Sequence, residues 1–272
     1  MEPNSPKDLL LRPKYDEDGE PVSASVSNSL GREVPLERFQ TLEKVVRDSP
    51  ITVEPYIELA TIYFDQHRWS DVRRVLDLGL AKFPEDEQAN YLHEEAQLLR
   101  SLEIYNQAKA AHEAEPTRLT LEPLERSKLE VNVLREKVCR ARLARHPEQL
   151  ELNLTLATAL ENLGQIDEAT LCLEAAVTSK DIRSEAALRL GRLYEKSNRI
   201  TDALSAYRRA AFFRLPAPSE ETKVAALMAA ANLSEKAGMV DSAQRYIEML
   251  SELQPQNSAL QQRLQELRQR PL

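Results

Sequence analysis

A six-residue pattern recurs four times along the chain, at 67–72, 164–169, 198–203 and 238–243. Each copy starts with a turn-forming or polar residue, has an apolar residue two positions later, and continues with a residue whose short side chain carries an oxygen. These oxygen-bearing residues are Ser70, Asp167, Thr201 and Asp241. Such side chains cap the exposed amides at a helix start, so we expect them to be N-caps. The pattern predicts the join of two closely packed helices.

Each copy ends on an apolar residue that suits close helix contact, and these are Val72, Ala169, Ala203 and Ala243. Apolar residues at helical spacing precede and follow every copy. Several of the helical pairs are then closed by a proline, at Pro50, Pro84, Pro147 and Pro255, where a helix cannot continue. With only 6 glycines and 5% aromatic residues, the composition also favours helix throughout. We therefore predict an all-α chain.

The spacing of the copies narrows the fold further. Ala169 and Ala203 are 34 residues apart, which is the period of the tetratricopeptide repeat. Leu190-Gly191, Tyr194, Ala203, Tyr207 and Ala210 also match the order of apolar, small and aromatic residues in that repeat. The sequence thus resembles the tetratricopeptide-repeat superfamily. The resemblance implies a right-handed solenoid of helical hairpins. The residue pattern adds one extended long-helix hairpin and a C-terminal capping helix.

On this basis we divide the chain into a disordered N-terminal tail and a repeat array. Prolines, serines and an acidic run fill the tail, residues 1–33, and little hydrophobic periodicity is present there. The array, 34–272, comprises a half unit at 34–52, repeats at 53–86, 150–183, 184–217 and 224–257, an extended hairpin at 87–149 and a capping helix at 258–270.

The extended hairpin departs from the repeat pattern. Two long helical patterns fill it, one from about 86 to 114 and one from about 123 to 146, and Pro123 suits the first turn of the second helix. One interpretation is a stretched hairpin that packs only on itself. The other is a coiled-coil arm that dimerises or docks a partner, because its apolar seam is broader than one helix partner requires.

Charge and composition restrict the classes of partner and compartment. The net charge of −8 disfavours nucleic acid and anionic membranes. The N-terminus lacks the pattern of a signal peptide, and no run of apolar residues approaches a membrane span, so we expect a cytoplasmic protein. Histidines, cysteines and glycines show no spacing typical of a catalytic, metal or cofactor site, so we expect no enzyme and no cofactor.

Recognition of another protein is the function that remains. In the superfamily that the chain resembles, the first helix of each unit lines a concave groove. The positions that the resemblance assigns to this groove are Ile57, Thr61, Phe64, Leu154, Thr158, Leu188, Arg192, Met228 and Asn232. We predict a scaffold or adaptor that binds a peptide or helix of a partner there. The alternative is a structural homo-oligomer assembled through the hairpin at 87–149.

Overall fold

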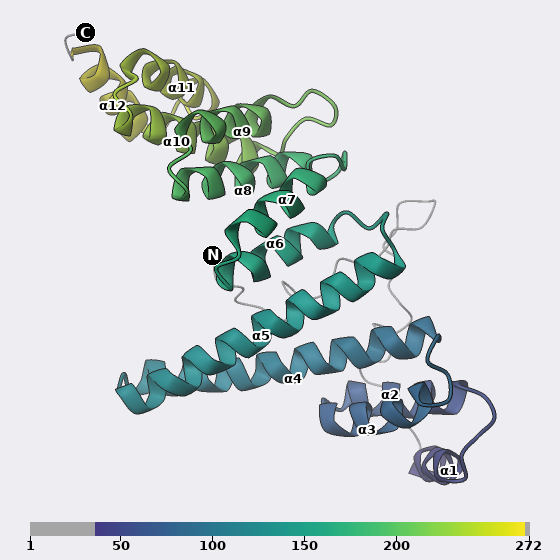
Figure 1. Ribbon diagram of the computed structural model, residues 1–272. Coiled ribbons are helices and arrows are strands. Elements are labelled where there is room, and N and C mark those ends of the chain that lie inside the picture. The colour runs from purple at the N-terminus through teal and green to yellow at the C-terminus, as the bar shows by residue number, and fades with distance from the viewer. Residues whose placement is uncertain (1–35, 270–272) are drawn as a thin grey trace. The chain divides into compact units, whose positions relative to one another are not determined.

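The computed structural model describes residues 36–269 of the 272-residue chain, and it confirms the all-α prediction (Figure 1). Residues 36–269 contain helices and no strands. The predicted disordered tail at 1–33 lies outside the described residues. The helices are α1 (Leu36–Arg47), α2 (Glu54–Asp65), α3 (Trp69–Leu80), α4 (Glu87–Ala114), α5 (Arg118–Arg145), α6 (Leu152–Asn162), α7 (Ile166–Ala176), α8 (Arg183–Lys196), α9 (Ile200–Phe212), α10 (Glu220–Lys236), α11 (Val240–Leu253) and α12 (Ser258–Gln269).

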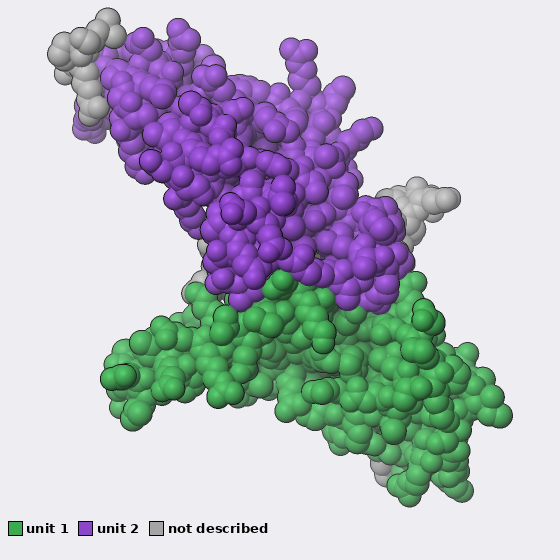
Figure 2. Space-filling view, viewed as in Figure 1, with its two compact units in different colours: residues 1–138 green, residues 139–272 purple. Residues whose placement is uncertain are grey.

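The chain divides into two compact units, 1–138 and 139–272, coloured separately in Figure 2. Helices α1 to α4 and most of α5 belong to unit 1, and the end of α5 with α6 to α12 belongs to unit 2. Each unit has its own buried apolar cluster.

The four copies of the sequence pattern form four turns with the same backbone geometry. The first residue of each copy has a left-handed backbone, with φ of 57° at His67, 78° at Gly164, 58° at Asn198 and 73° at Gly238. In the turn at Asn198, the next amide, that of Arg199, donates back to the Tyr194 carbonyl at 2.8 Å, and the Asn198 amide donates to Glu195 at 3.0 Å. The other three turns repeat both bonds, which together form the Schellman motif.

This turn geometry corrects the predicted helix caps. The residue just after the left-handed one is the N-cap of the next helix, so each helix starts earlier than the position of the oxygen-bearing side chain implied. The four N-caps are Arg68, Gln165, Arg199 and Met239, and none makes a side-chain capping bond. Ser70, Asp167, Thr201 and Asp241 are therefore the second residues of their helices, and their prediction as N-caps was wrong.

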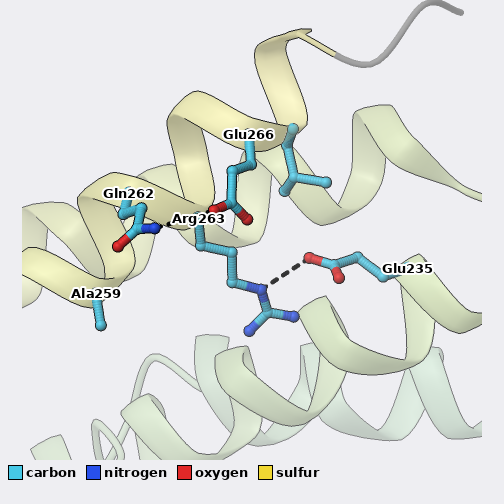
Figure 3. A pocket seen from close by; sticks show the side chains of 6 residues that line it. Glu235, Ala259, Gln262, Arg263 and Glu266 are labelled. Carbon is cyan, nitrogen blue, oxygen red and sulfur yellow. Dashed lines mark hydrogen bonds and ion pairs between the residues drawn. The ribbon is translucent and has the colours of Figure 1, made fainter.

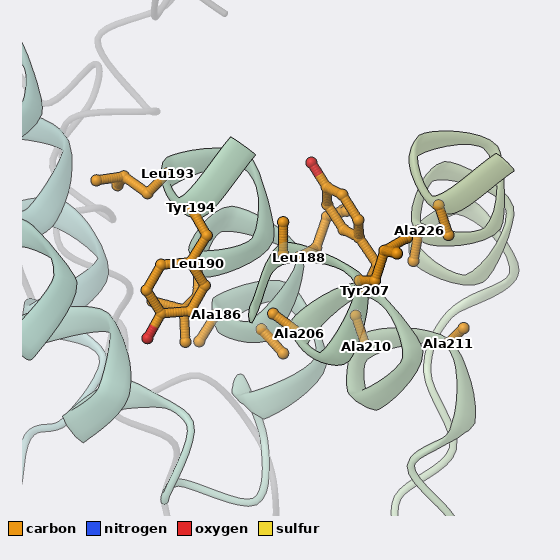
Figure 4. Close-up of a cluster of buried hydrophobic side chains, with 14 of the residues drawn as sticks. Ala186, Leu188, Leu190, Leu193, Tyr194, Ala206, Tyr207, Ala210, Ala211 and Ala226 are labelled. Carbon is orange, nitrogen blue, oxygen red and sulfur yellow. The ribbon is translucent and has the colours of Figure 1, made fainter. Parts of the chain in front are cut away.

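The core of unit 2 is built largely from alanine and leucine on consecutive helices. Ala169, Ala203 and Ala243, from the recurring pattern, are fully buried. Figure 4 shows side chains of α8 and α9, among them Leu190, Tyr207 and Ala210, gathered with Ala226 of α10. Small side chains allow these helices to approach closely, as the sequence indicated. Leu260 and Leu267 of α12 are buried against the same cluster.

Unit 1 holds most of the long hairpin. Helices α4 and α5 each have 28 residues, about 42 Å at 1.5 Å per residue. Leu102 and Tyr105 of α4 pack with Val131 of α5, and His112 Nδ1 lies 2.9 Å from Thr120 Oγ1 near the connection. These contacts align the two helices as an antiparallel pair.

The second long helix begins earlier than predicted. It starts at Arg118, so Pro123 is its sixth residue and not part of its first turn. The hydroxyls at the turn explain the start: the Thr120 amide donates to Thr117 Oγ1 at 3.3 Å, and Thr120 Oγ1 donates to the Glu115 carbonyl at 2.7 Å. These bonds satisfy polar groups that a helix end otherwise leaves without partners. The helix tolerates the proline at the loss of one backbone bond.

Candidate functional site

In unit 1, the three predicted groove residues lie on α2. Ile57 is 9% exposed and belongs to the buried cluster. Thr61 is half-buried, and its hydroxyl donates to the Ile57 carbonyl at 2.8 Å. Phe64 is also half-buried, with its ring edge-to-face to that of Trp69 at 5.1 Å between centroids. Thr61 and Phe64 are therefore the residues of this set that can reach a ligand.

In unit 2, the six predicted residues lie in pairs on α6, α8 and α10. Leu154 and Leu188 are 9% and 7% exposed, and both belong to the core cluster. Thr158 and Met228 are half-buried, whereas Arg192 and Asn232 are exposed. The two leucines of the set are therefore core residues, and the polar members are the ones that reach solvent.

A series of ion pairs, which we call the ladder, connects α6, α8 and α10 to one another. Glu161 of α6 pairs with Lys196 of α8, and Glu195 of α8 pairs with Lys236 of α10 at 3.2 Å. The glutamates are one repeat apart, because 34 residues separate Glu161 from Glu195. Each carboxylate on one helix is thus neutralised by a lysine of the next. An exposed pair of this kind contributes about 0–1 kcal/mol, so the ladder adds little to the stability of the fold.

Further hydrogen bonds hold two charged residues of α8, Glu195 and Arg189, in place. The Tyr207 hydroxyl of α9 donates to Glu195 Oε2 at 2.8 Å, and burial together with this carboxylate raises the pKa of Tyr207. On α8, Arg189 donates to Thr158 Oγ1 at 3.1 Å and to Glu185 at 2.6 Å. Glu195 and Arg189 are therefore positioned by neighbours on other turns or helices and cannot turn freely towards a ligand.

The last ion pair of the ladder joins α10 and α12 (Figure 3). Arg263 donates to Glu235 Oε1 at 2.9 Å and to Asn232 Oδ1 at 2.7 Å, and its third nitrogen lies 3.6 Å from the Met228 sulfur. A pocket of about 300 Å³ opens beside it, lined by Glu235, Ala259, Gln262, Arg263, Glu266 and Leu267. The sequence did not identify Arg263, because it follows Glu235 by 28 residues and so falls outside the 34-residue period.

Arg192 differs from the other charged groups of this surface. It is exposed, and it makes no ion pair or hydrogen bond with any of residues 36–269. We use "ladder surface" for the following residues of unit 2: Thr158, Glu161, Glu185, Arg189, Arg192, Glu195, Lys196, Met228, Asn232, Glu235, Lys236 and Arg263. This surface holds five cations and four carboxylates, in a chain whose net charge is −8. Its unpaired charge is therefore positive.

Two other kinds of site are absent from the described part of the chain. No group of three or more His, Cys, Asp and Glu side chains in residues 36–269 is arranged to hold a metal ion. No helix in the same range is both long and apolar enough to cross a membrane.

The repeated geometry decides the fold type. Each of the four helical hairpins has a Schellman turn with the same two hydrogen bonds. The equivalent core alanines of two of these hairpins, Ala169 and Ala203, are 34 residues apart. The fold is of the tetratricopeptide-repeat type. This confirms the resemblance and fold class predicted from the sequence. No protein-family model matches the chain, and no curated protein matches it.

Several solved structures resemble the chain at low identity, and two of those below are described as TPR proteins. YrrB, described as a TPR protein with an unusual peptide-binding site, is 17% identical, with 82% of this chain and 97% of that chain covered and a TM-score of 0.49. TTC0263, a TPR protein of Thermus thermophilus, is 18% identical, covering 79% and 98%, with a TM-score of 0.37. A chain of the Naa15/Naa10 complex bound to HypK-THB is 16% identical, covering 86% of this chain but only 36% of its own length, with a TM-score of 0.47. Each is a likeness in helical-repeat architecture and nothing more.

Proposed function

We propose that the protein is a non-enzymatic interaction scaffold whose ladder surface binds an acidic peptide or helix of a partner protein. The observation that carries this proposal is the unpaired guanidinium of Arg192 on a surface where the carboxylates are already bound by neighbouring cations. A partner carboxylate would meet a cation there without displacing an existing pair. Bidentate contact with a carboxylate is the geometry that a guanidinium provides best.

The surroundings of Arg192 fit a ligand with apolar side chains between its acidic ones. Met228 is half-buried on the neighbouring helix, and methionine adapts to ligands of different shape. Ala259 and Leu267 supply apolar atoms to the pocket beside Arg263. Apolar contacts would supply affinity, and Arg192 with Asn232 would fix the register of the ligand.

The α2 residues of unit 1 form a second proposed contact region. Thr61 and the Phe64–Trp69 ring pair are the groups there that remain partly accessible. An aromatic pair of this kind binds apolar side chains with little loss of its own freedom. We propose the two regions as separate contacts, each to be tested by its own variants.

The proposal is tested with an array of short immobilised peptides that vary in charge and hydropathy. We expect the wild type to bind peptides that combine Glu or Asp with Leu, and the variant Arg192→Glu to bind them at least about tenfold more weakly, since like charges then face each other. The matched control is Arg209→Glu on α9, which reverses an exposed arginine away from the ladder surface. Equal binding by wild type and Arg192→Glu, or equal loss in both variants, would contradict the proposal.

A further inference from the structure

The face of α5 that points away from α4 carries two exposed apolar side chains. Leu129 is 55% exposed and Val133 is 50% exposed, and one helical turn separates them. The opposite face of α5 is the one that packs on α4, through Leu124 and Val131. The long hairpin therefore uses one face of α5 for its own core and leaves a second apolar stripe uncovered by unit 1.

Charged residues flank this pair at matching distances and with opposite signs. Arg126 precedes Leu129 by three residues, and Glu136 follows Val133 by three residues. The four residues occupy alternate steps of three and four, the spacing of the contact positions in a coiled coil. Two helices with this spacing can pack along the stripe over about three turns.

The order of the four residues makes the stripe complementary to itself. When a second α5 is placed antiparallel about a two-fold axis level with Val131, Leu129 of one copy faces Val133 of the other. Arg126 of one copy then faces Glu136 of the other. Because of the two-fold symmetry, each of these two contacts occurs twice in the dimer. A parallel arrangement would instead place Arg126 opposite Arg126. Opposite charges across such an interface select the antiparallel pairing.

We propose that a second copy of this chain docks on this face, so that the protein forms an antiparallel two-fold dimer through Arg126, Leu129, Val133 and Glu136 of α5. Isologous two-fold contact requires a patch that complements itself, and this face meets that requirement. The occupant is chosen by the charge pattern, because an unrelated helix would have to reproduce the same sequence of positive, apolar, apolar and negative groups.

The Arg126 guanidinium is accessible to a second carboxylate. Arg126 contacts Glu130 on its own helix at 3.0 Å, and its side chain is 79% exposed. Glu136 is half-buried and also has contacts within the chain. Exposed pairs within one helix are weak and can be shared with a second partner. Arg140 is already paired with Glu168 and lies outside the proposed interface.

The proposed interface is short, so the dimer is expected to be weak and concentration-dependent. Contacts of this size fall in the class of small, transient interfaces, which bury less than about 1,200 Å². The oligomeric state must therefore be measured over a range of concentrations, from a few micromolar to several hundred micromolar.

The test is sedimentation equilibrium of the full chain across that range. We expect the wild type to pass from monomer to dimer, and Leu129→Glu to weaken the dimer at least about tenfold while the far-UV circular dichroism stays unchanged. The control Leu171→Glu alters a similarly exposed leucine on α7, 65% exposed, and is expected to dimerise like the wild type. A wild type that stays monomeric throughout, or a dimer that Leu129→Glu leaves intact, overturns the proposal.

Charge exchange tests the antiparallel arrangement itself. Arg126→Glu and Glu136→Arg should each weaken self-association, because each places like charges opposite each other in both layers. Mixing these two variants should restore a dimer of wild-type strength, since every pair across the axis again has opposite signs. The double variant Arg126→Glu with Glu136→Arg should also dimerise like the wild type. Single variants that dimerise as well as the wild type, or a mixture that stays monomeric, overturn the proposed pairing.

Discussion

Gly191 of α8 lies directly against the ring of Tyr207 of α9. A Cβ atom at Gly191 would come within 2.5 Å of both Cδ1 and Cε1 of that ring. The ring has no room to retreat, because Tyr207 is fully buried and its hydroxyl is bonded to Glu195 at 2.8 Å. The glycine of the Leu190-Gly191 pair is therefore needed for the approach of two helices and not for a turn.

Gly191→Ala should accordingly destabilise the protein by about 1–3 kcal/mol, the usual cost of overpacking a core. The measurement is the urea denaturation midpoint. In a Tyr207→Leu background, the same Gly191→Ala change should become neutral or stabilising, because alanine has a helix propensity about 1 kcal/mol better than glycine. An unchanged midpoint for Gly191→Ala in the wild-type background would show that the ring contact does not limit this position.

The left-handed turn residues make a second prediction. Asn198 has φ of 58° and Gly164 has φ of 78°, and no atom lies within 4 Å of a Cβ placed on Gly164. Any cost of Gly164→Ala thus comes from the backbone alone, and we expect about 1 kcal/mol. We expect a similar cost for Asn198→Ala, because asparagine tolerates the left-handed backbone better than alanine does. The control is Ser197→Ala, whose backbone has φ of −84° and which should change the free energy of unfolding by less than about 0.5 kcal/mol. Equal effects at positions 197 and 198 would contradict this explanation.

The sequence was sufficient to predict these hairpins because their turns and core contacts are local and periodic. Left-handed Gly164 and Gly238, and buried Ala169 and Ala203, recur at positions that a repeat pattern displays directly. The N-caps were predicted wrongly because the Schellman bonds, which fix where the next helix starts, depend on backbone conformation. Ser70 and its equivalents have side chains typical of an N-cap, but they are the second residues of their helices.

The candidate site could be predicted only in part. The first helices were assigned correctly as helices, but which groove residues face solvent depends on helix rotation, and Leu154 and Leu188 face the core. The pairing of Glu235 with Arg263 was not predictable, because Arg263 follows Glu235 by 28 residues and not by the 34-residue period. Arg192 likewise could not be singled out from the sequence, because the sequence does not show that the neighbouring carboxylates are paired with other cations.

The two partners of Glu195 should contribute unequally to stability. Glu195→Ala leaves the hydroxyl of the buried Tyr207 without its acceptor, which costs about 1–3 kcal/mol. Lys236→Ala removes only a surface pair, because the lysine side chain is 71% exposed, and should cost less than about 1 kcal/mol. Chemical denaturation measures both, and Glu195→Gln, which keeps an acceptor, should fall between them. A Lys236→Ala variant as unstable as Glu195→Ala would contradict the assignment.

Tyr63 predicts a loss of stability at high pH. Burial, followed by its hydrogen bond to Glu43, raises the pKa of Tyr63 from 10.0 to about 12. The folded protein therefore keeps a proton that the unfolded chain loses above about pH 10, so this contribution to stability is complete below pH 10 and disappears as pH rises towards 12.

The variant Tyr63→Phe isolates this effect. Between about pH 10 and pH 12, the free energy of unfolding should fall more steeply with pH in the wild type than in Tyr63→Phe, because only the wild type has this phenol to ionise. Below about pH 9 the two curves should run parallel. Parallel curves over the whole range would show that Tyr63 titrates alike in the folded and unfolded states.

The most direct test of the proposed binding surface uses the methionine methyl groups of unit 2. Met228 lies on the ladder surface beside Arg263, whereas Met239 and Met249, 39% and 38% exposed, lie outside that surface and serve as internal controls. An acidic peptide chosen from the array is titrated into protein labelled with carbon-13 at the methionine methyls. We predict that the Met228 signal shifts in proportion to binding, that Met239 and Met249 stay in place, and that Arg192→Glu abolishes the shift. Binding that moves Met239 or Met249 and leaves Met228 unchanged would contradict the account.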